Sequence, residues 1–305
     1  MVCDLVESDT RLHKPAVAGS SPAAATFSRT LADGTIICES GEQDYFGWKG
    51  YVNCSQLKQL DESPLAFRDL YVTGSATRPT SDAFDFGKKL HSRMQLGESE
   101  FYNRCEDATG KEVTATGAIS AVGRARMAEL EAEGKYLLTP QDHEKLNGIL
   151  ANALEIPLIQ QALDDRVAAE FNIRFKLNGH WAKSRIDHAT PDGFWDWKTT
   201  REPNPYQWAR SAIRFRYHMQ AAFYARAGVA AGWPWHAMKF VVMSTVWPFE
   251  VAVVELPDNA MRRGDELVVK LIEELAVRRE WDFWHRYEVL DTHVARVPDY
   301  LLREV

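Results

Sequence analysis

Apolar and polar residues alternate along residues 169–177. A period of two residues puts successive side chains on opposite faces of a strand, so this segment is predicted to be a half-buried β-strand. Asn178-Gly179 favours a two-residue hairpin turn, and Pro191-Asp192 lies in a second tight-turn sequence. The pattern therefore predicts three antiparallel strands, at about 169–177, 180–189 and 194–200.

Helices are predicted on both sides of these strands. Ser63-Pro64, Thr139-Pro140 and Asn204-Pro205 each combine an N-cap residue with proline at the first helical position, and Ser81 is a further candidate cap. Two more apolar strand segments follow near the C-terminus. The predicted helices are 55–61, 64–72, 81–95, 140–163, 205–228 and 258–284, and the two later strands are 239–247 and 249–256.

The order of elements indicates one mixed α/β domain of the α+β type, with a central, mostly antiparallel sheet flanked by helices. Residues 1–45 are rich in small residues without periodicity, and we expect a poorly ordered N-terminal extension with structure beginning near Trp48. The single domain is predicted to span 46–290, with a tail at 291–305. Its parts are a helical segment at 46–165, a sheet with its helix at 166–256, and a C-terminal helix at 257–285.

Composition narrows the class of protein. The hydrophobic content of 45% is enough for one large core. No apolar run approaches the roughly 20 residues of a membrane helix, and the first thirty residues lack a secretory pattern, so a cytoplasmic protein without a membrane partner is expected. The four cysteines form no CxxC pair, which argues against zinc or iron–sulfur sites.

The net charge of −7 argues against non-specific coating of nucleic acid, because that affinity comes from lysine and arginine. A basic stretch nevertheless runs from Lys198 to Arg226 with Glu202 as its single acid. It could be a local nucleic-acid contact or simply a solvated helix face. The candidate phosphate contacts are Arg210, Arg214 and Arg216.

The two turns predict a register for three acidic residues. If Asn178-Gly179 closes the first hairpin, Glu170 lies opposite Asp187; if Pro191-Asp192 closes the second, Asp187 lies opposite Asp196. Directly opposed like charges on adjacent strands are destabilising. Something must therefore compensate for three neighbouring carboxylates.

Two compensations are open from the pattern alone. A divalent cation such as Mg²⁺ prefers hard oxygen ligands and is held by one or two carboxylates plus substrate phosphate. Alternatively, diagonal ion pairs to Arg185 and Lys198 could neutralise the acids in an amphipathic ribbon whose buried side carries Ile186, Trp195 and Trp197. In either case strand alternation places Asp196 and Lys198 on one face. Carboxylates beside an ammonium group suit metal-assisted hydrolysis, where the ammonium orients water or stabilises developing charge.

The motifs that carry a family resemblance are KSRID ending at Asp187, WDWKTT with Asp196 and Lys198, and FRYHMQAAFY with Gln220 and Tyr224. This stretch resembles the nuclease domain of exodeoxyribonuclease VIII, the RecE-like branch of the PD-(D/E)XK superfamily. The likeness covers roughly 46–250 and includes CSQLKQLDESPLAF upstream. It implies the restriction-endonuclease-like core, with Asp187 and Asp196 as metal ligands and Lys198 as the catalytic lysine.

The resemblance also suggests roles for four other residues. His91 in FDFGKKLHSRM matches a family histidine that contributes to the metal site, although a histidine among apolar residues is often part of the core. Glu170 matches an acid before the first strand and would be a supporting ligand or position water. Gln220 and Tyr224 match the Q-x-x-x-Y motif and share a helix face that could meet DNA. The sequence departs from the family in its short spacing from Asp187 to Asp196 and in the tryptophans that flank Asp196.

The resulting expectation is a deoxyribonuclease that uses one or two Mg²⁺ or Mn²⁺ ions. Exonuclease action on duplex ends in recombination or phage-type DNA processing is favoured by the resemblance, and so are a single-strand annealing recombinase as partner and a homo-oligomeric assembly. The alternatives are a PD-(D/E)XK endonuclease, because the shared core does not fix whether ends are needed, and a non-catalytic DNA-binding scaffold. A related nuclease with an iron–sulfur cluster is disfavoured by the cysteine spacing.

Overall fold

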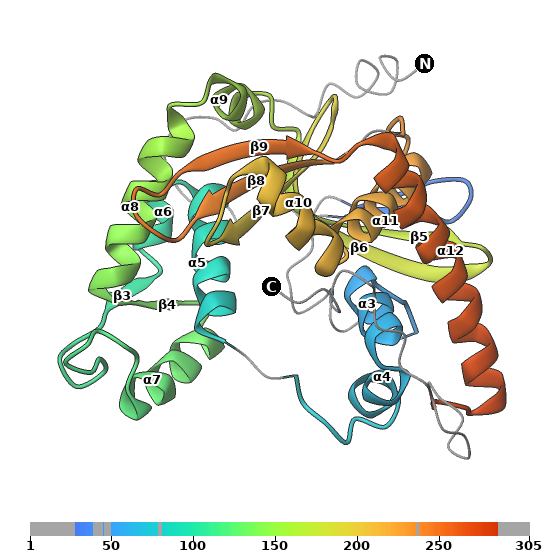
Figure 1. Ribbon diagram of the computed structural model, residues 1–305, viewed down its shortest axis with the longest axis horizontal. Helices are drawn as coiled ribbons and strands as arrows, with labels where there is room; N and C mark the ends of the chain where they lie inside the picture. The colour runs from blue at the N-terminus through green and yellow to red at the C-terminus, as the bar shows by residue number, and fades with distance from the viewer. Residues whose placement is uncertain (1–27, 39–44, 46–49, 79–80, 236–237, 286–305) are drawn as a thin grey trace, which may run out of the picture.

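The structure is a computed structural model in which residues 28–38, 45, 50–78, 81–235 and 238–285 are described. A seven-stranded sheet forms the centre of the molecule, in the order β1-β2-β5-β6-β7-β8-β9 (Figure 1). The strands are β1 Ser28–Thr30, β2 Ile36–Cys38, β5 Ala168–Leu177, β6 His180–Thr190, β7 Gly193–Thr200, β8 Lys239–Ser244 and β9 Val251–Glu255. Only the β7–β8 pair in this sheet is parallel, so the predicted mixed, mostly antiparallel sheet is confirmed.

Helices cover both faces of the sheet. They are α3 Cys54–Glu62, α4 Pro64–Tyr71, α5 Asp82–Leu96, α6 Glu98–Tyr102, α7 Ala121–Ala132, α8 Pro140–Leu154, α9 Pro157–Asp164, α10 Pro205–Arg214, α11 Tyr217–Ala230 and α12 Asp258–Trp281. The short parallel strands β3 Cys105–Asp107 and β4 Tyr136–Leu138 form a second sheet. Parallel β7 and β8 need a long crossover connection, which α10 and α11 provide.

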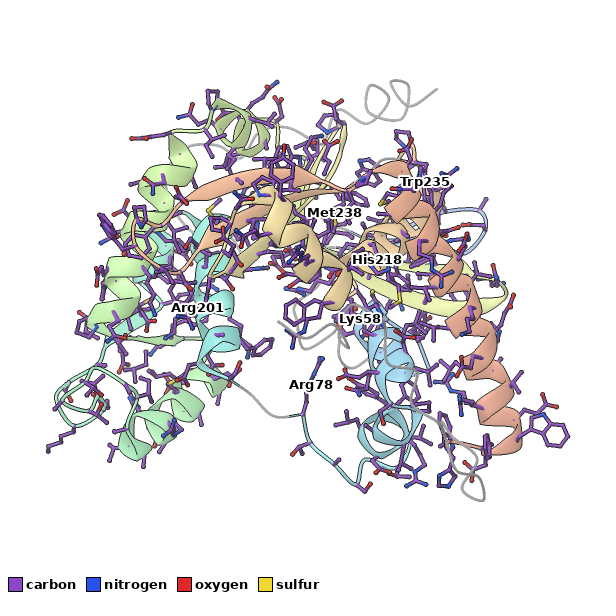
Figure 2. The ribbon with its side chains drawn as sticks, viewed as in Figure 1. Lys58, Arg78, Arg201, His218, Trp235 and Met238 are labelled. Atoms are coloured by element: carbon purple, nitrogen blue, oxygen red, sulfur yellow. The ribbon has the colours of Figure 1, made fainter. Side chains whose placement is uncertain are left out.

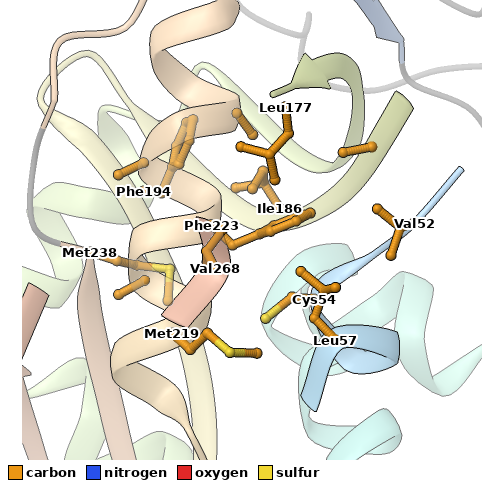
Figure 3. Packing of buried hydrophobic residues seen from close by; sticks show 14 of the residues in the cluster. Val52, Cys54, Leu57, Leu177, Ile186, Phe194, Met219, Phe223, Met238 and Val268 are labelled. Atoms are coloured by element: carbon orange, nitrogen blue, oxygen red, sulfur yellow. The ribbon is translucent and has the colours of Figure 1, made fainter. Parts of the chain in front are cut away.

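Two hydrophobic cores result from this arrangement. The α11-side core joins strand residues such as Ile173 and Ile186 to Phe223 of α11 and Val268 of α12 (Figure 3). The α8-side core lies on the other face, and its members include Leu90 of α5, Leu146 of α8, Trp195, Trp197 and Val241. The central strands are therefore buried on both faces, as in sheets covered by helices on each side.

Helix starts were predicted better than helix lengths. Ser63, Ser81 and Thr139 each accept a hydrogen bond from a first-turn backbone N–H, as expected. The predicted helix 140–163 is wrong, because it is divided into α8 and α9 at Pro157, whose ring cannot continue the preceding turn. The predicted helix 205–228 is likewise two helices, separated where Arg216 adopts the left-handed conformation with φ 57°.

The expectation that structure begins near Trp48 is wrong. Strand β2 pairs with β5, with Ile37 opposite Ile173, and β1 pairs with β2 at the edge of the sheet. Such short strands are stabilised by burial against a longer neighbour, which local periodicity does not reveal. The rest of the predicted extension, residues 1–27 and most of 39–45, and the predicted tail at 291–305 lie outside the described residues.

The hairpin register agrees with the turn sequences. Pairs Ala169–His188 and Phe171–Ile186 bracket Glu170 and Asp187, which are thus opposed as predicted. On the other side, the β6–β7 ladder begins at the turn and ends at His188–Trp195, one residue before Asp187 and Asp196. The two aspartates therefore lie where β6 and β7 separate, rather than as a paired rung.

Side-chain alternation changes phase at the same place. Phe171 packs in the α11-side core and so does Ala168, although strict alternation would put these two side chains on opposite faces. Glu170, between them, has φ 48° in the left-handed region, which permits the shift. The ribbon with one buried side is therefore wrong: Ile186 packs in the α11-side core, whereas Trp195 and Trp197 pack in the α8-side core.

Candidate metal centre and its lysine side

Three side chains from three elements converge at the phase shift. His91 of α5 places its Nδ1 3.4 Å from Asp187 Oδ2 and 4.0 Å from Glu170 Oε1. One potential ligand atom from each of His91, Glu170 and Asp187 lies within 4.8 Å of the other two. These residues are separated in sequence, so only the packing of α5 against β7 and the hairpin of β5 and β6 brings them together.

The hydrogen bonding of His91 suits a ligand. Its Nε2 lies 2.7 Å from the Trp197 carbonyl oxygen, and because a carbonyl only accepts, the proton belongs on Nε2. The Nδ1 lone pair is then directed to the carboxylates. A metal-binding histidine commonly donates its other N–H to a backbone carbonyl in this way, which fixes its tautomer.

The three acids are not equally neutralised. Arg185 donates to Glu170 at 2.7 Å, and Lys198 forms a close ion pair with Asp196. Asp187 accepts a hydrogen bond from Trp197 N at 3.2 Å, but no lysine or arginine in the described part of the chain pairs with it. The ion-pair explanation therefore accounts for two acids and leaves Asp187 without a direct ion pair to a lysine or arginine of the described residues.

Burial and repulsion act on the acidic side. Burial, followed by the charge of Asp196, raises the pKa of Asp187 to about 7. Burial and then Asp187 raise the pKa of Glu170. Burial lowers the pKa of His91, which favours its neutral form. A neutral imidazole beside two carboxylates fits a divalent cation, because the cation would supply the missing positive charge.

Asp196 is held on the other side of the centre by α11. Its Oδ1 accepts a hydrogen bond from Gln220 Nε2 at 2.7 Å, and Oδ2 faces Lys198. Asp196 is 1% exposed and Gln220 is 8% exposed. Burial acts to lower the pKa of Lys198, but Asp196 and Asp187 outweigh it and raise that pKa, so the ammonium stays charged.

Sequence reasoning missed Lys58. This α3 residue donates from Nζ to Gln220 Oε1 at 2.9 Å, and so fixes which end of the Gln220 amide faces Asp196. Lys58 and Lys198 lie 5.0 Å and 5.2 Å from the centroid of the same Tyr217 ring. Burial lowers the pKa of Lys58 to about 8. No local pattern pointed to it, because its partner is 162 residues away.

Tyr224, the second residue of the Q-x-x-x-Y motif, lies one turn after Gln220 on α11. Burial, followed by the charge of Asp187, raises its pKa well above the usual value. The Gln220 amide is engaged with Asp196 and Lys58. The proposed DNA contacts of this pair stay predictions.

The predicted arginines differ in their surroundings. Arg216 forms an ion pair with Asp61 of α3 at 2.6 Å, which ties α3 to the junction of α10 and α11. Arg210 and Arg214 lie on α10, where only Trp208 and Ala212 are buried, and both are exposed. Within the described ranges neither has a carboxylate partner.

A cavity of about 460 Å³ lies between α5, the start of α8 and the end of β7. Its lining includes Phe86, the buried ion pair of Lys89 with Asp142, and Arg201. None of the four residues around the carboxylates, namely His91, Glu170, Asp187 and Asp196, lines it. The candidate centre is therefore a separate, more tightly packed site.

A family model described as "PDDEXK-like domain of unknown function (DUF3799)" matches residues 53–286. The chain belongs to this family. The PDDEXK-like domain thus includes every residue of the candidate centre, whereas β1 and β2 precede the matched range.

A solved structure has the same fold as this PDDEXK-like domain. It is described as a "putative exonuclease" from Eubacterium rectale, with a TM-score of 0.61 and 13% sequence identity. The match covers 85% of this chain and 96% of the other. No curated protein matches the sequence. The family and the fold together support a nuclease, without assigning the RecE-like branch.

Asp187 and the Asp196-Trp197-Lys198 segment lie within the matched range, and their assignment to a D…(D/E)-x-K pattern stays a prediction from the sequence. The structure groups Glu170 with His91 and Asp187, while Asp196 is directed to Gln220 and Lys198. In the part of the chain that the structure describes, no helix has the length and apolarity to cross a membrane.

Proposed function

We propose that this chain is a deoxyribonuclease dependent on Mg²⁺ or Mn²⁺. The observation that carries the proposal is the convergence of His91, Glu170 and Asp187 beside the Asp196–Lys198 ion pair, with no lysine or arginine among the described residues paired with Asp187. Hard oxygen donors with one imidazole suit these ions. His91, Glu170, Asp187 and Asp196 would hold one or two of them.

The bound cation would polarise the scissile phosphate and lower the pKa of a water molecule. The residues of the chain supply the rest. Lys198 presents an ammonium group that can stabilise developing negative charge on phosphate oxygens. Gln220 holds Asp196 through Oδ1, so that this carboxylate keeps its orientation when DNA enters. Trp197 N–H does the same for Asp187.

Exonuclease action on duplex ends is the mode we propose within this activity. It is supported by the motif resemblance to exodeoxyribonuclease VIII and by the description of the structural neighbour as a "putative exonuclease". Arg210 and Arg214, exposed on α10 near the end of β7, are proposed contacts to the DNA backbone.

The test uses linear duplex DNA labelled at one 5′ end beside a closed circular substrate, with Mg²⁺, Mn²⁺ or EDTA. Metal-dependent loss of linear DNA with circles spared is expected. Asp196→Asn should abolish it, whereas Asp192→Asn in the exposed β6–β7 turn is the matched control and should be fully active. Cleavage of circles would replace the exonuclease by an endonuclease, and a folded protein without cleavage would favour a DNA-binding scaffold.

A further inference from the structure

Positive charge accumulates on the lysine side of the centre. Lys58 and Lys198 approach the same Tyr217 ring, and Asp196 is the carboxylate between them that pairs with Lys198. An ammonium group has three N–H donors, and the Lys58 ammonium uses one of them on Gln220. No carboxylate among the described residues lies within ion-pair distance of Lys58.

Arg78 adds a third cation from a separate element. It belongs to the segment that joins α4 to α5, and it is exposed and close enough to Lys58 to act on it electrostatically. Figure 2 places Arg78 below Lys58, extending from that segment toward it. Among the residues that the structure describes, Arg78 has no acidic partner either.

Lys58, with Lys198 and Arg78 near it, forms a candidate site for an anion. Because folding alone gains nothing from gathering like charges, their placement is explained by a ligand that neutralises them. In a DNA nuclease the available anions are phosphates, and lysine and arginine are the side chains that bind them. Under the proposed function, Lys198 acts on the scissile phosphate.

We propose that Lys58 and Arg78 form a phosphate subsite that binds the backbone phosphate next to the scissile one. This inference rests on the proposed nuclease function. It adds a second contact to the DNA strand that carries the scissile phosphate. Lys58 and Lys198, which both lie close to the Tyr217 ring, would then contact two consecutive phosphates. The subsite fixes the register of the strand, so that one particular phosphodiester bond lies at the metal centre.

The first experiment measures DNA binding without turnover. The full chain in EDTA is titrated into a fluorescent oligonucleotide by anisotropy over a series of salt concentrations, using wild type, Lys58→Met, Lys58→Arg and Arg78→Gln. Each lost phosphate contact should reduce the slope of log K against log salt by about 0.7–0.9. We expect this reduction for Lys58→Met and Arg78→Gln, with Lys58→Arg retaining the wild-type slope.

Lys176→Met is the matched control. Lys176 also lies over an aromatic ring, 5.2 Å from the Trp181 centroid, but on the hairpin end of β5 away from the centre. This variant should keep both the slope and the affinity. Equal slopes for wild type and Lys58→Met, with both proteins folded by circular dichroism, would overturn the proposal.

The second experiment locates the phosphate. Single methylphosphonate linkages remove the charge of one phosphate at a time, and wild type should lose roughly tenfold in affinity at the subsite position. A methylphosphonate at the subsite position should not reduce the DNA affinity of Lys58→Met any further. At every other position it should reduce the affinity of Lys58→Met and of wild type by the same factor. Equal losses for both proteins at every position would contradict the proposal. Failure of the nuclease function would be distinguishable. The wild type would then show the expected salt slopes and methylphosphonate losses but would not cleave DNA with Mg²⁺ or Mn²⁺.

Discussion

The two sides of the candidate centre have opposite charge imbalances. On the acidic side, Arg185 pairs with Glu170, His91 is favoured in its neutral form, and Asp187 pairs with no lysine or arginine of the described residues. On the lysine side, Lys198 neutralises Asp196, and Lys58 leaves one positive charge. Backbone N–H of Trp197, in the strand segment between Asp196 and Lys198, donates to Asp187 and so connects the two sides.

The two imbalances call for ligands of opposite charge. A cation would balance the acidic side and an anion the lysine side, and a metal-bound phosphate supplies both at once. The pair of imbalances is a stronger argument for phosphodiester chemistry than either side alone. A buried acid cluster or a buried lysine can be structural, but complementary excess charges at adjacent positions point to one ligand.

Disrupting the connection between the two sides should have the largest effect on the rate of DNA hydrolysis. Asp196→Asn removes the carboxylate that lies between the metal centre and Lys198, and Lys198→Met removes the ammonium group. Each should lower the rate of DNA hydrolysis by about 10³-fold or more, because charge stabilisation at the scissile phosphate is lost. Single-turnover assays with saturating protein measure this rate, and a loss below tenfold in either variant would contradict the assignment.

Weakening only the acidic side should change metal affinity more than DNA affinity. Glu170→Gln keeps the shape of the side chain but removes one negative charge from the His91 group. Mn²⁺ affinity measured by calorimetry should fall by about 10- to 100-fold, the range seen when supporting groups of metal sites are replaced. Glu202→Gln, on the loop after β7, is the control. An unchanged Mn²⁺ affinity in Glu170→Gln would remove Glu170 from the centre.

The sequence allowed the register of the acids to be predicted because turn chemistry is local. Asn178-Gly179 determines which residues of β5 and β6 face each other, so Glu170 and Asp187 were placed opposite one another correctly. The Asp187–Asp196 rung expected from Pro191-Asp192 does not form, because the β6–β7 ladder ends one pair earlier. The phase shift at Glu170 was not predictable, because a left-handed glutamate is stabilised by Arg185 and by the surrounding packing rather than by its own propensity.

Other features could not be predicted from the sequence because they depend on contacts between residues far apart in the chain. Strand β2 is too short to show a period and depends on β5 for its stability. In the sequence, Lys58 resembles any other helical lysine. Only the packing of α3 against α11 brings it to Gln220. Pro157 could have predicted the break between α8 and α9. The apolar pattern continues through it, however, and suggested one helix.

Removing the excess positive charge should stabilise the fold. Burial, followed by smaller contributions of either sign from the charges of Cys54, Lys198, Asp196 and Arg78, lowers the pKa of Lys58 from 10.5 to about 8. Between these pH values the unfolded state binds more protons, so the free energy of unfolding rises with pH, and the penalty is complete below pH 8. Lys58→Met should therefore be more stable than wild type at pH 7 by about 2 kcal/mol, after allowance for the lost hydrogen bond.

Urea unfolding of wild type and Lys58→Met at pH 7 and pH 10 measures this difference. The advantage of the variant should shrink as the pH rises toward 10.5. Lys176→Met, whose lysine is exposed, should show no such trend. A variant that is less stable than wild type at pH 7 would mean that the Lys58 ammonium is well compensated by the protein itself.

The smallest effects are expected for the two arginines that belong to neither side of the candidate centre. Arg216 is engaged with Asp61, whereas Arg210 is exposed without a carboxylate partner in the described part of the chain. Arg210→Gln should weaken DNA binding a few-fold at low salt, about the effect of one phosphate contact. Arg216→Gln should leave DNA binding unchanged and destabilise the fold by about 0.5–1 kcal/mol. The reverse outcome would place the DNA track along α11 instead of α10.

The most direct test of opposite imbalances is a calorimetric titration of Mn²⁺ into the full chain, with and without an oligonucleotide whose scissile linkage cannot be cleaved. If one metal-bound phosphate balances both sides, DNA should tighten Mn²⁺ binding by at least about tenfold, and Mn²⁺ should tighten DNA binding by the same factor. Asp187→Asn should abolish this coupling while the protein stays folded. Mn²⁺ binding that is absent, or that is indifferent to both DNA and Asp187, would contradict the account.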